Sequence, residues 1–348
     1  MLRFEYKRSA MNVTAMQANR QLSLFQLPAQ SAKPQPPCQE KPGDEPCPEP
    51  PKDTALISID VPEYDPPPLP AASMNFDLNT LKVRPGQKID LTKVATTPPE
   101  GVPHKKSEAA RVLDTMMERI IDLQRKLYSE NKQSLLVVLQ GMDNAGKGGT
   151  YKDVFAPMIA SHEAGIERNT FKAPSSVERD HNFLWRITDK MPATGNIGLF
   201  DRSHYEDIVE VRVSNLAPEE VWQARHQHIN DFEKLQGNMG TKIVKLFLHI
   251  DKAEQKERLE DRRQTPHKQY KFSADDVARR AKWGEYQEAY SDVISRTSTE
   301  EAPWYVIPAD DKDARNLMVA GILLKTLEAM APEYPPLPED LVKLPIPD

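Results

Sequence analysis

The stretch that most constrains the fold of this chain runs from Leu135 to Thr150 and reads LLVVLQGMDNAGKGGT. Its first six residues carry no charge, which is typical of a strand buried on both faces. A glycine-rich turn follows, and a helical pattern begins where that turn ends in GKGG. Such a turn can point backbone N–H groups at an anion, the helix adds the positive end of its dipole, and Lys147 adds a full charge. The stretch therefore predicts a strand, a phosphate-binding loop and a helix.

The spacing of this loop, G-x-x-x-x-G-K, is a weak signal by itself, because it occurs by chance in about one chain in ten of this length. The apolar strand in front of it favours the phosphate-binding interpretation over an ordinary glycine-rich turn. One departure from the usual motif concerns the metal ion. The Ser or Thr that normally follows the lysine and holds Mg²⁺ is Gly148 here, so other groups must hold the metal. Asp143, inside the loop, is the first candidate.

Strands and helices alternate along the rest of the chain. Short apolar runs predict strands, and longer stretches with apolar residues three and four apart predict helices. The strands are expected over 168–172, 197–200, 242–250 and 304–307, and the helices from Ser107 for about 20 residues and over 151–160, 218–236, 274–296 and 312–330. A further helix, capped by Ser175 or Ser176 and containing residues 183–185, is expected to end before Pro192. This alternation predicts an α/β fold of three layers, with helices on both faces of a parallel sheet.

Asp201 directly follows the short apolar strand predicted over 197–200. In a parallel sheet of this kind, ligands bind at the carboxyl ends of the strands, where a second metal-binding carboxylate of a phosphotransferase belongs. Asp143 and Asp201 together can hold Mg²⁺, with Mn²⁺ as its substitute, since Mg²⁺ takes one or two carboxylates and completes its shell with phosphate oxygens and water. Arg202 would then face phosphate charge. The alternative for Asp201 is a helix cap or a turn.

A strongly charged region lies between residues 251 and 282, with ten Lys or Arg against seven Asp or Glu. Most of these residues have the pattern of salt-bridged surface helices. The exception is RRQTPHKQYKFS, because no acidic residue lies between Arg262 and Ser273. We interpret residues 258–282 as a mobile basic helical lid over a polyanion. Ser273 with Asp276 three residues on forms a variant capping box, which predicts a helix start near residue 274.

The composition restricts the partners and the compartment. The chain has 348 residues and a formal charge of -6, so we expect neither nucleic acid nor a membrane surface as a partner. It contains no apolar run of membrane-spanning length and no signal-peptide pattern, which predicts a cytoplasmic protein. Cys38 and Cys47 lack metal-site spacing and are expected to be free thiols.

The composition also predicts the domain organisation. Residues 1–75 are rich in proline and are expected to be a disordered arm, with docking to a proline-recognising partner as the alternative. Residues 76–106 are expected to be an extended arm that packs on the core. Residues 107–335 would form the phosphotransferase domain, and residues 336–348 a proline-rich tail.

Several motifs in the same order carry a family resemblance: VRPGQKIDL, QGMDNAGKGGT, HNFLWR, LFDRSHYED, KFSADDVARRAKW and RTSTEEAPWYVIPADDK. Over residues 76–335 the chain resembles the second polyphosphate kinase family, the P-loop polyphosphate:nucleotide phosphotransferases. The resemblance implies reversible transfer of a terminal phosphoryl group between inorganic polyphosphate and an adenine or guanine nucleotide, with Mg²⁺. It also implies a P-loop kinase-like fold that self-associates as a homodimer or homotetramer. FLWR, SHYED and PGQKIDL are most similar to the branch that accepts AMP as well as ADP.

The resemblance also assigns roles to residues. The family's loop aspartate and lysine correspond to Asp143 and Lys147, and its Asp-Arg pair to Asp201 and Arg202; these four are the expected catalytic residues. The residues expected to bind phosphate and polyphosphate are Gly141, Asn144, Ala145, Gly146, Gly148, Gly149, Arg262, Lys268, Lys271 and Asp276.

The chain departs from the family's pattern at three places. The lid's usual Asp-Pro reads Thr265-Pro266, and its usual Trp reads Tyr270. The AMP-using branch more often has Lys-Asp-Gly and Asn-Arg where this chain has KGG at 147–149 and Asp201-Arg202. These departures leave the preferred acceptor nucleotide open.

Two other classes of function share some of these features. An ATP-dependent nucleotide or small-molecule kinase would have the same loop and carboxylates, although the basic lid and the missing Ser or Thr argue against it. A non-catalytic P-loop module would tolerate the loss of Lys147 or Asp201, yet both residues are present.

Overall fold

A six-stranded sheet with the order β1-β6-β5-β2-β4-β3 forms the centre of the fold. It is seen in a computed structural model of the chain, which describes residues 75–161 and 165–346. All neighbouring strands are parallel except β1, which pairs antiparallel with β6. The strands are β1 (Lys82–Val83), β2 (Ser134–Gly141), β3 (Ile166–Thr170), β4 (Ile197–Asp201), β5 (Thr241–His249) and β6 (Trp304–Pro308).

Strand β2 occupies the middle of the sheet, and every one of its residues is buried. It pairs with β4, where Leu139 lies opposite Asp201, and with β5, where Gly141 lies opposite Leu248. A strand flanked on both sides and covered on both faces must be apolar, which explains the uncharged run LLVVLQ. The register also brings the end of β4 beside the end of β2, and so brings Asp201 towards the loop.

The helices vary from single turns to 25 residues. They are α1 (Lys106–Glu130), α2 (Lys147–Thr150), α3 (Ala156–Ser161), α4 (Ser176–Arg179), α5 (Trp185–Thr188), α6 (Glu206–Val213), α7 (Glu219–Asn238), α8 (Lys252–Gln264), α9 (Ala274–Ala281), α10 (Trp283–Thr297), α11 (Lys312–Met330) and α12 (Glu339–Val342). Three short 3-10 turns, η1 (Leu78–Leu81), η2 (Leu91–Lys93) and η4 (Pro266–Lys271), and one π-helical turn, η3 (Tyr151–Phe155), complete the described elements. None of the helices in the described ranges combines the length and the apolar character that crossing a bilayer requires.

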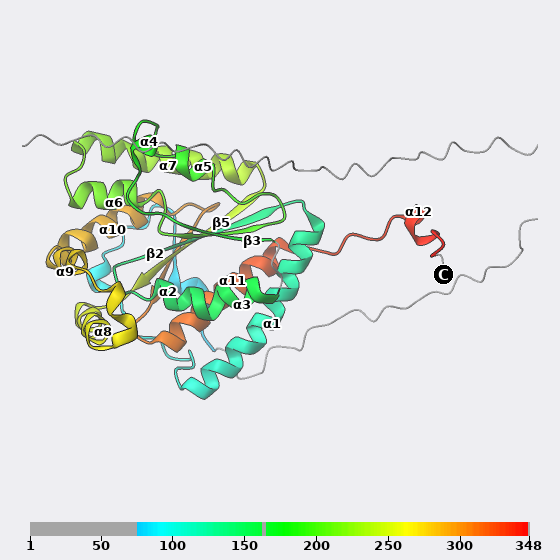
Figure 1. Cartoon of the computed structure of the whole chain (residues 1–348), viewed down its shortest axis with the longest axis horizontal. Helices are drawn as coiled ribbons and strands as arrows, with labels where there is room; N and C mark the ends of the chain where they lie inside the picture. Colours follow the sequence, from blue (N-terminus) through cyan, green and yellow to red (C-terminus); the bar gives the residue numbers. More distant parts are fainter. Residues whose placement is uncertain (1–74, 162–164, 347–348) are drawn as a thin grey trace, which may run out of the picture. The chain divides into compact units, whose positions relative to one another are not determined.

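The two faces of the sheet belong to two separate apolar cores. Leu135, Val137 and Leu139 pack with residues of α1, α3 and α11, whereas Leu136 and Val138 pack with residues of α6, α7 and α10. Alternate residues of a strand point to opposite faces, so each strand supplies both cores. The result is helix, sheet and helix in three layers, as Figure 1 shows. The predicted three-layer α/β fold with a parallel sheet is confirmed.

The segment before α1 packs along β6 and α10. Strand β1 adds a short antiparallel edge to β6, and Ser298 Oγ donates to the Val83 carbonyl at 2.6 Å. Further along, the amides of Ile89 and Leu91 donate to Ser295 and Ser291 of α10. The segment contains a short strand and two 3-10 turns and is held to β6 and α10 by hydrogen bonds, whereas the predicted domain boundaries stay predictions. The predicted arm over 1–75, apart from its last residue, and both cysteines lie outside the described residues.

Four element predictions need correction. The helix expected between Ser176 and Pro192 is two single turns, α4 and α5, separated by residues 180–184. The single helix expected over 274–296 is two helices, because Lys282 leaves the helical conformation and its Nζ donates to the Val213 carbonyl at 2.9 Å. Helix α6 was not predicted, because Ile208, Val209 and Val213 bury it without forming a stripe of helical period. Strand β3 ends at Thr170 instead of residue 172, because its last residues pair with the end of β4.

Candidate active site

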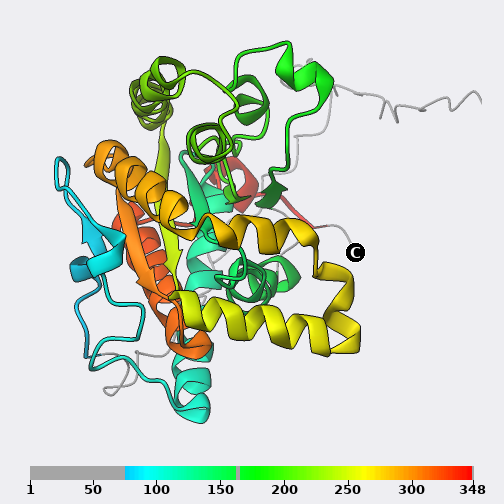
Figure 2. The same ribbon diagram turned by 90° about the vertical axis from the view of Figure 1, so that its left-hand side faces the viewer.

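A large cleft lies at the carboxyl end of the sheet, between the loop, the ends of β3 and β4, the start of α11 and the lid. Its volume is about 850 Å³, and ten lysines and arginines line it against five aspartates. Figure 2 faces this end of the molecule, with α8 and α9 in front of the sheet. The predicted residues that line it are Asp143, Asn144, Gly146, Lys147, Gly148, Gly149, Asp201, Arg202, Arg262, Lys268, Lys271 and Asp276.

Two predicted loop residues, Gly141 and Ala145, do not line this cleft. Gly141 has φ +152°, and a Cβ there would come within 2.7 Å of the Leu248 carbonyl oxygen, so its role is to let the loop leave β2 beside β5. Ala145 is completely buried. Both residues support the conformation of the loop on the side away from the cleft, so their predicted contact with phosphate stays a prediction.

Gly146 has φ +110° and stands directly before the first residue of α2. A Cβ at this position would overlap Nη1 of Arg315 and lie 2.9 Å from its Cζ. Only glycine combines this left-handed backbone with so close an arginine. Arg315, from the first turn of α11, is 2% exposed and lines the cleft, so the glycine allows a buried cation to reach the loop.

Lys147 begins α2, and its ammonium folds back over the start of the loop. Nζ donates to the carbonyls of Gly141 at 2.6 Å and Met142 at 3.2 Å. Burial and the charge of Arg202 lower its pKa, while Asp143 and Asp201 oppose that change. The ammonium therefore lies within the field of both predicted metal-binding carboxylates.

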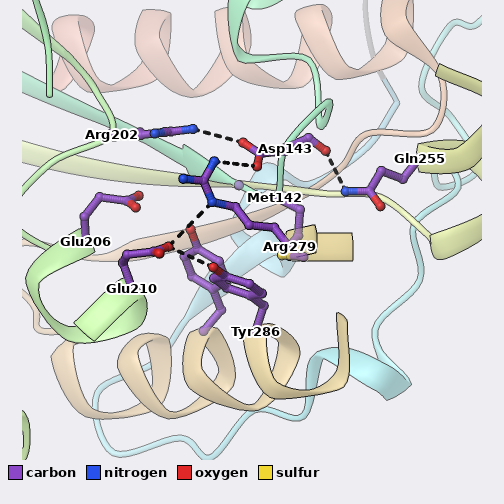
Figure 3. Close-up of a pocket in the computed structure, with 10 residues that line it drawn as sticks. Met142, Asp143, Arg202, Glu206, Glu210, Gln255, Arg279 and Tyr286 are labelled. Carbon is purple, nitrogen blue, oxygen red and sulfur yellow. Dashed lines mark hydrogen bonds and ion pairs between the residues drawn. The ribbon is translucent and has the colours of Figure 1, made fainter. Parts of the chain in front are cut away.

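Asp143 is held on both carboxylate oxygens. Oδ1 accepts from Arg202 at 2.9 Å, and Oδ2 accepts from Arg279 of α9 at 3.3 Å, as Figure 3 shows. Burial alone would raise the pKa of Asp143, but the charges of Lys147, Arg202 and Arg279 outweigh burial and lower it. Asp143 is therefore ionised at neutral pH, as a metal ligand must be.

Asp201 and Arg202 occupy the end of β4. The Asp201 carboxylate accepts from Arg168 of β3 at 2.7 Å. Arg202 has φ +63°, an uncommon conformation for a residue with a side chain, and its amide donates to the Leu139 carbonyl at 3.1 Å. Backbone strain of this kind is concentrated at functional sites, where the surrounding structure holds it in place. Here it turns the Arg202 side chain back to Asp143.

A second, smaller cavity adjoins Asp143 on the side of α6 and α10 (Figure 3). Glu206 and Glu210 line it together with Tyr286 and Tyr290, and the Tyr286 hydroxyl donates to Glu210 at 2.8 Å. Burial raises the pKa of Glu206, although the charge of Arg202 opposes the change. None of these four residues was singled out from the sequence. The SHYED motif, which contains Glu206, was the available signal.

The lid consists of the second half of α8, the turn η4 and α9. Lys268 is paired with Asp261 at 2.7 Å, and Arg262 lies 3.5 Å from Asp276 and donates to the Lys271 carbonyl. No acidic residue lies between Arg262 and Ser273, but two basic residues of this stretch still have acidic partners, because Asp261 and Asp276 lie just outside it. The Lys268 pair is exposed, and such pairs contribute little to stability, so Lys268 can exchange its partner for phosphate.

Further cations in the cleft were missed by the sequence reasoning. Arg258 appeared to belong to a salt-bridged helix, and Arg315 to a core helix. Burial together with the nearby charge of Arg258 lowers the pKa of Arg315 to about 10. The others are Lys152, Lys172 and Lys312. These five residues come from α8, α11, η3 and the segment after β3. Because they converge only in the folded protein, no local pattern in the sequence marks them.

This cleft is suited to phosphate groups, and the loop at its floor would place them next to carboxylates that can hold a metal. On these grounds the chain is a P-loop phosphotransferase. Comparison with known proteins gives the family: residues 103–335 match the family described as Polyphosphate kinase 2 (PPK2). The chain belongs to this family, and the predicted resemblance is confirmed.

Individual relatives agree with the family match. The chain is 42% identical over 254 residues to an AMP/ADP-polyphosphate phosphotransferase of Meiothermus ruber, covering 73% of this chain and 94% of the relative. It is 37% identical over 274 residues to an ADP-polyphosphate phosphotransferase of Rhodopseudomonas palustris, covering 75% and 93%. Among solved structures, polyphosphate kinase 2 from Arthrobacter aurescens TC1 superposes with a TM-score of 0.71 at 37% identity, covering 76% of this chain and 93% of that one.

Proposed function

We propose that the protein transfers a terminal phosphoryl group between inorganic polyphosphate and AMP or ADP. The observation that carries the proposal is the cleft with ten lysines and arginines against five aspartates, which opens onto the phosphate loop. A polyanion with one charge per phosphate is the ligand that so many converging cations would bind. The relatives named for polyphosphate and AMP or ADP support the same substrates.

Phosphoryl transfer asks a protein mainly to align the reacting groups and to neutralise charge. In our proposal the amides at the start of α2 and the ammonium of Lys147 hold the phosphates at the point of transfer. Arg202 and the lid residues Arg262, Lys268 and Lys271 bind the polyphosphate chain and the charge that develops during transfer. Because the nucleotide phosphate is largely ionised near neutral pH, the acceptor requires no strong general base.

Asp143 and Asp201 fit a Mg²⁺ or Mn²⁺ ion as a pair of carboxylates. They flank Lys147 at the ends of neighbouring strands, and no cluster of three or more metal-binding side chains occurs within residues 75–161 and 165–346. Two carboxylates suffice for Mg²⁺ when phosphate and water complete its shell. When bound, the ion would supply positive charge against the phosphates. Arg202 and Arg279 on Asp143 and Arg168 on Asp201 would keep the two carboxylates in place and add further positive charge beside the phosphates.

The experiment that tests the proposal compares donors. The purified protein receives Mg²⁺ and either AMP or ADP, with long-chain polyphosphate or ATP as the donor, and the nucleotide products are separated and measured. Phosphorylation with polyphosphate supports the proposal, and phosphorylation with ATP alone identifies an ATP-dependent kinase instead. Guanine nucleotides are the next acceptors to test. Light scattering would test the predicted dimer or tetramer, and the cytoplasmic location stays a prediction.

A further inference from the structure

The carbonyl groups of residues 141–145 in the phosphate loop are each bound by a side chain of the protein. Lys147 donates to the carbonyls of residues 141 and 142. Gln255 of α8 donates to the carbonyl of Asp143 at 2.8 Å, and Arg258, one turn further along α8, donates to the carbonyls of Asn144 and Ala145, both at 3.1 Å. Three successive carbonyls of the loop are therefore held by one helix.

Arg258 connects the loop to two other parts of the fold. Its Nη2 donates to the carbonyls of Ala309 and Asp310, just before α11, at 2.7 and 2.8 Å. Its Nε donates to Glu254 at 2.6 Å, which fixes the guanidinium against its own helix. The side chain is only 10% exposed. A planar group with five donors can satisfy four carbonyls and a carboxylate at once, whereas an ammonium has three donors and no fixed plane.

Gln255 extends the same arrangement to the next helix. It is 1% exposed, and its Oε1 accepts from Arg280 of α9 at 2.9 Å. Arg280 also donates to the carbonyl of Lys252 at the start of α8. The first half of α8, residues 252–258, is thus fixed both to the loop and to α9. We call this half the root of the lid.

The direction in which the carbonyls point decides what the loop can bind. A carbonyl oxygen that turned into the cleft would repel phosphate, whereas the first amides of α2 have no acceptor within their own helix and are free for an anion. Donors that bind the carbonyls on the side away from the cleft keep the loop in the orientation in which its amides point at phosphate. Since a catalytic arrangement tolerates little displacement, such fixation bears directly on the rate.

We propose that Gln255 and Arg258 are positioning residues that hold the carbonyl face of the phosphate loop, so that the root of the lid and the loop form one rigid unit. This inference rests on the proposed function for its kinetic consequences. It assigns the root of the lid a task that is separate from binding polyphosphate. The basic residues between Arg262 and Lys271 would then move relative to a fixed root.

A direct electrostatic role for Arg258 is the rival explanation, because this residue also lines the cleft. The two roles make opposite predictions for lysine. Arg258→Lys keeps the charge but cannot reproduce the set of carbonyl contacts, whereas Arg258→Met loses both. Arg263→Met is the matched control, since it makes the same change on the exposed neighbouring arginine of α8, away from the cleft. Gln255→Met removes one carbonyl contact of the loop, together with the contact to Arg280, and takes the place of the Arg258 variants if those fold poorly.

The experiment measures kcat, KM for polyphosphate, thermal unfolding and hydrogen exchange over residues 141–150 in each full-length variant. For Arg258→Met and Arg258→Lys we expect kcat to fall by about 10²-fold, the cost of misplacing reacting groups by about 1 Å. KM for polyphosphate should change far less. Exchange of the loop amides should accelerate in both variants and in Gln255→Met, while Arg263→Met behaves as the unmodified protein.

Three results would overturn the proposal. In the first, the kcat of Arg258→Lys lies within a factor of about two of that of the unmodified protein, which would show that Arg258 acts through its charge. In the second, loop exchange stays unchanged in all three variants. In the third, exchange accelerates equally throughout the protein, which would indicate general destabilisation. If the unmodified protein transfers no phosphate, the proposed function fails, and the exchange comparison still decides this inference.

Discussion

Replacing Gly146 with alanine tests the geometry of the phosphate loop most sharply. The residue has φ +110°, and a Cβ would overlap the guanidinium of Arg315. Holding a non-glycine residue in such a conformation costs about 1–3 kcal/mol, while the reduced freedom of the unfolded chain returns about 0.4–1 kcal/mol. Arg315 must also move, although its side chain is 2% exposed. Because the displacement of Arg315 adds to the backbone cost, we expect a net loss of about 1–2 kcal/mol.

The control lies two residues further on. Gly148 is the second residue of α2, has no positive φ, and a Cβ there would meet nothing within 4 Å. Alanine is favoured over glycine inside a helix by about 0.5–1 kcal/mol. Gly148→Ala should therefore leave the stability unchanged or raise it. The two substitutions add the same methyl group to the same loop.

The assay is thermal unfolding, combined with phosphoryl transfer from polyphosphate. For a domain of this size each kcal/mol shifts Tm by about 2–4 °C, so Gly146→Ala should lower Tm by roughly 2–8 °C and Gly148→Ala should not lower it. Transfer should also fall in Gly146→Ala, because the displaced Arg315 lines the cleft. Equal Tm values for both variants would refute the account of the loop.

Three further predictions concern two carboxylates and the lysines of the lid. Asp143→Asn should reduce kcat by at least about 10²-fold with the fold intact by circular dichroism, because the loop loses the carboxylate that we propose holds the metal. Near-normal turnover would remove Asp143 from that proposed role. Replacing Lys268 and Lys271 with alanine should raise KM for polyphosphate more than KM for nucleotide, and the difference should shrink as salt rises and screens the lysines of the unmodified protein; equal changes for both ligands would contradict a polyphosphate-binding lid. In the folded protein, burial raises the pKa of Glu206 above its ordinary 4.5. Above pH 4.5 the unfolded state therefore loses this proton while the folded state still holds it, so the free energy of unfolding falls as pH rises. Denaturant unfolding should show Glu206→Gln more stable than the unmodified protein at pH 7 and nearly equal to it at pH 4; a constant difference between the two pH values would contradict this.

The parts of the fold that could be predicted from the sequence are those in which one segment determines its own environment. The run LLVVLQ is apolar on both faces, so it had to be a central strand, and the structure buries all of β2. Asp201 follows a second apolar run, and the ends of neighbouring parallel strands meet at one edge of a sheet. The loop aspartate and the strand-end aspartate could therefore be placed in one cleft from residue types and order alone.

The remaining features depend on contacts between distant segments. Arg258 and Arg315 line the cleft because α8 and the start of α11 both pack against the loop, and neither helix shows this in its own pattern. Helix α6 is buried without an apolar stripe, and α9 ends where the side chain of Lys282 reaches Val213. Asp261 and Asp276 lie just outside the stretch in which partners for the lid lysines and arginines were sought. Each of these features follows from tertiary packing, which short-range periodicity does not encode.

The central claim is that this cleft passes phosphate between a polyphosphate chain and an adenine nucleotide. Its most direct test is the nucleotide product formed from AMP or ADP, with Mg²⁺ and long-chain polyphosphate as the sole phosphoryl donor, and Lys147→Met as the control variant. The account predicts ADP or ATP that accumulates with polyphosphate consumption and is nearly absent in the control. Nucleotide phosphorylation that occurs with ATP but not with polyphosphate would contradict it.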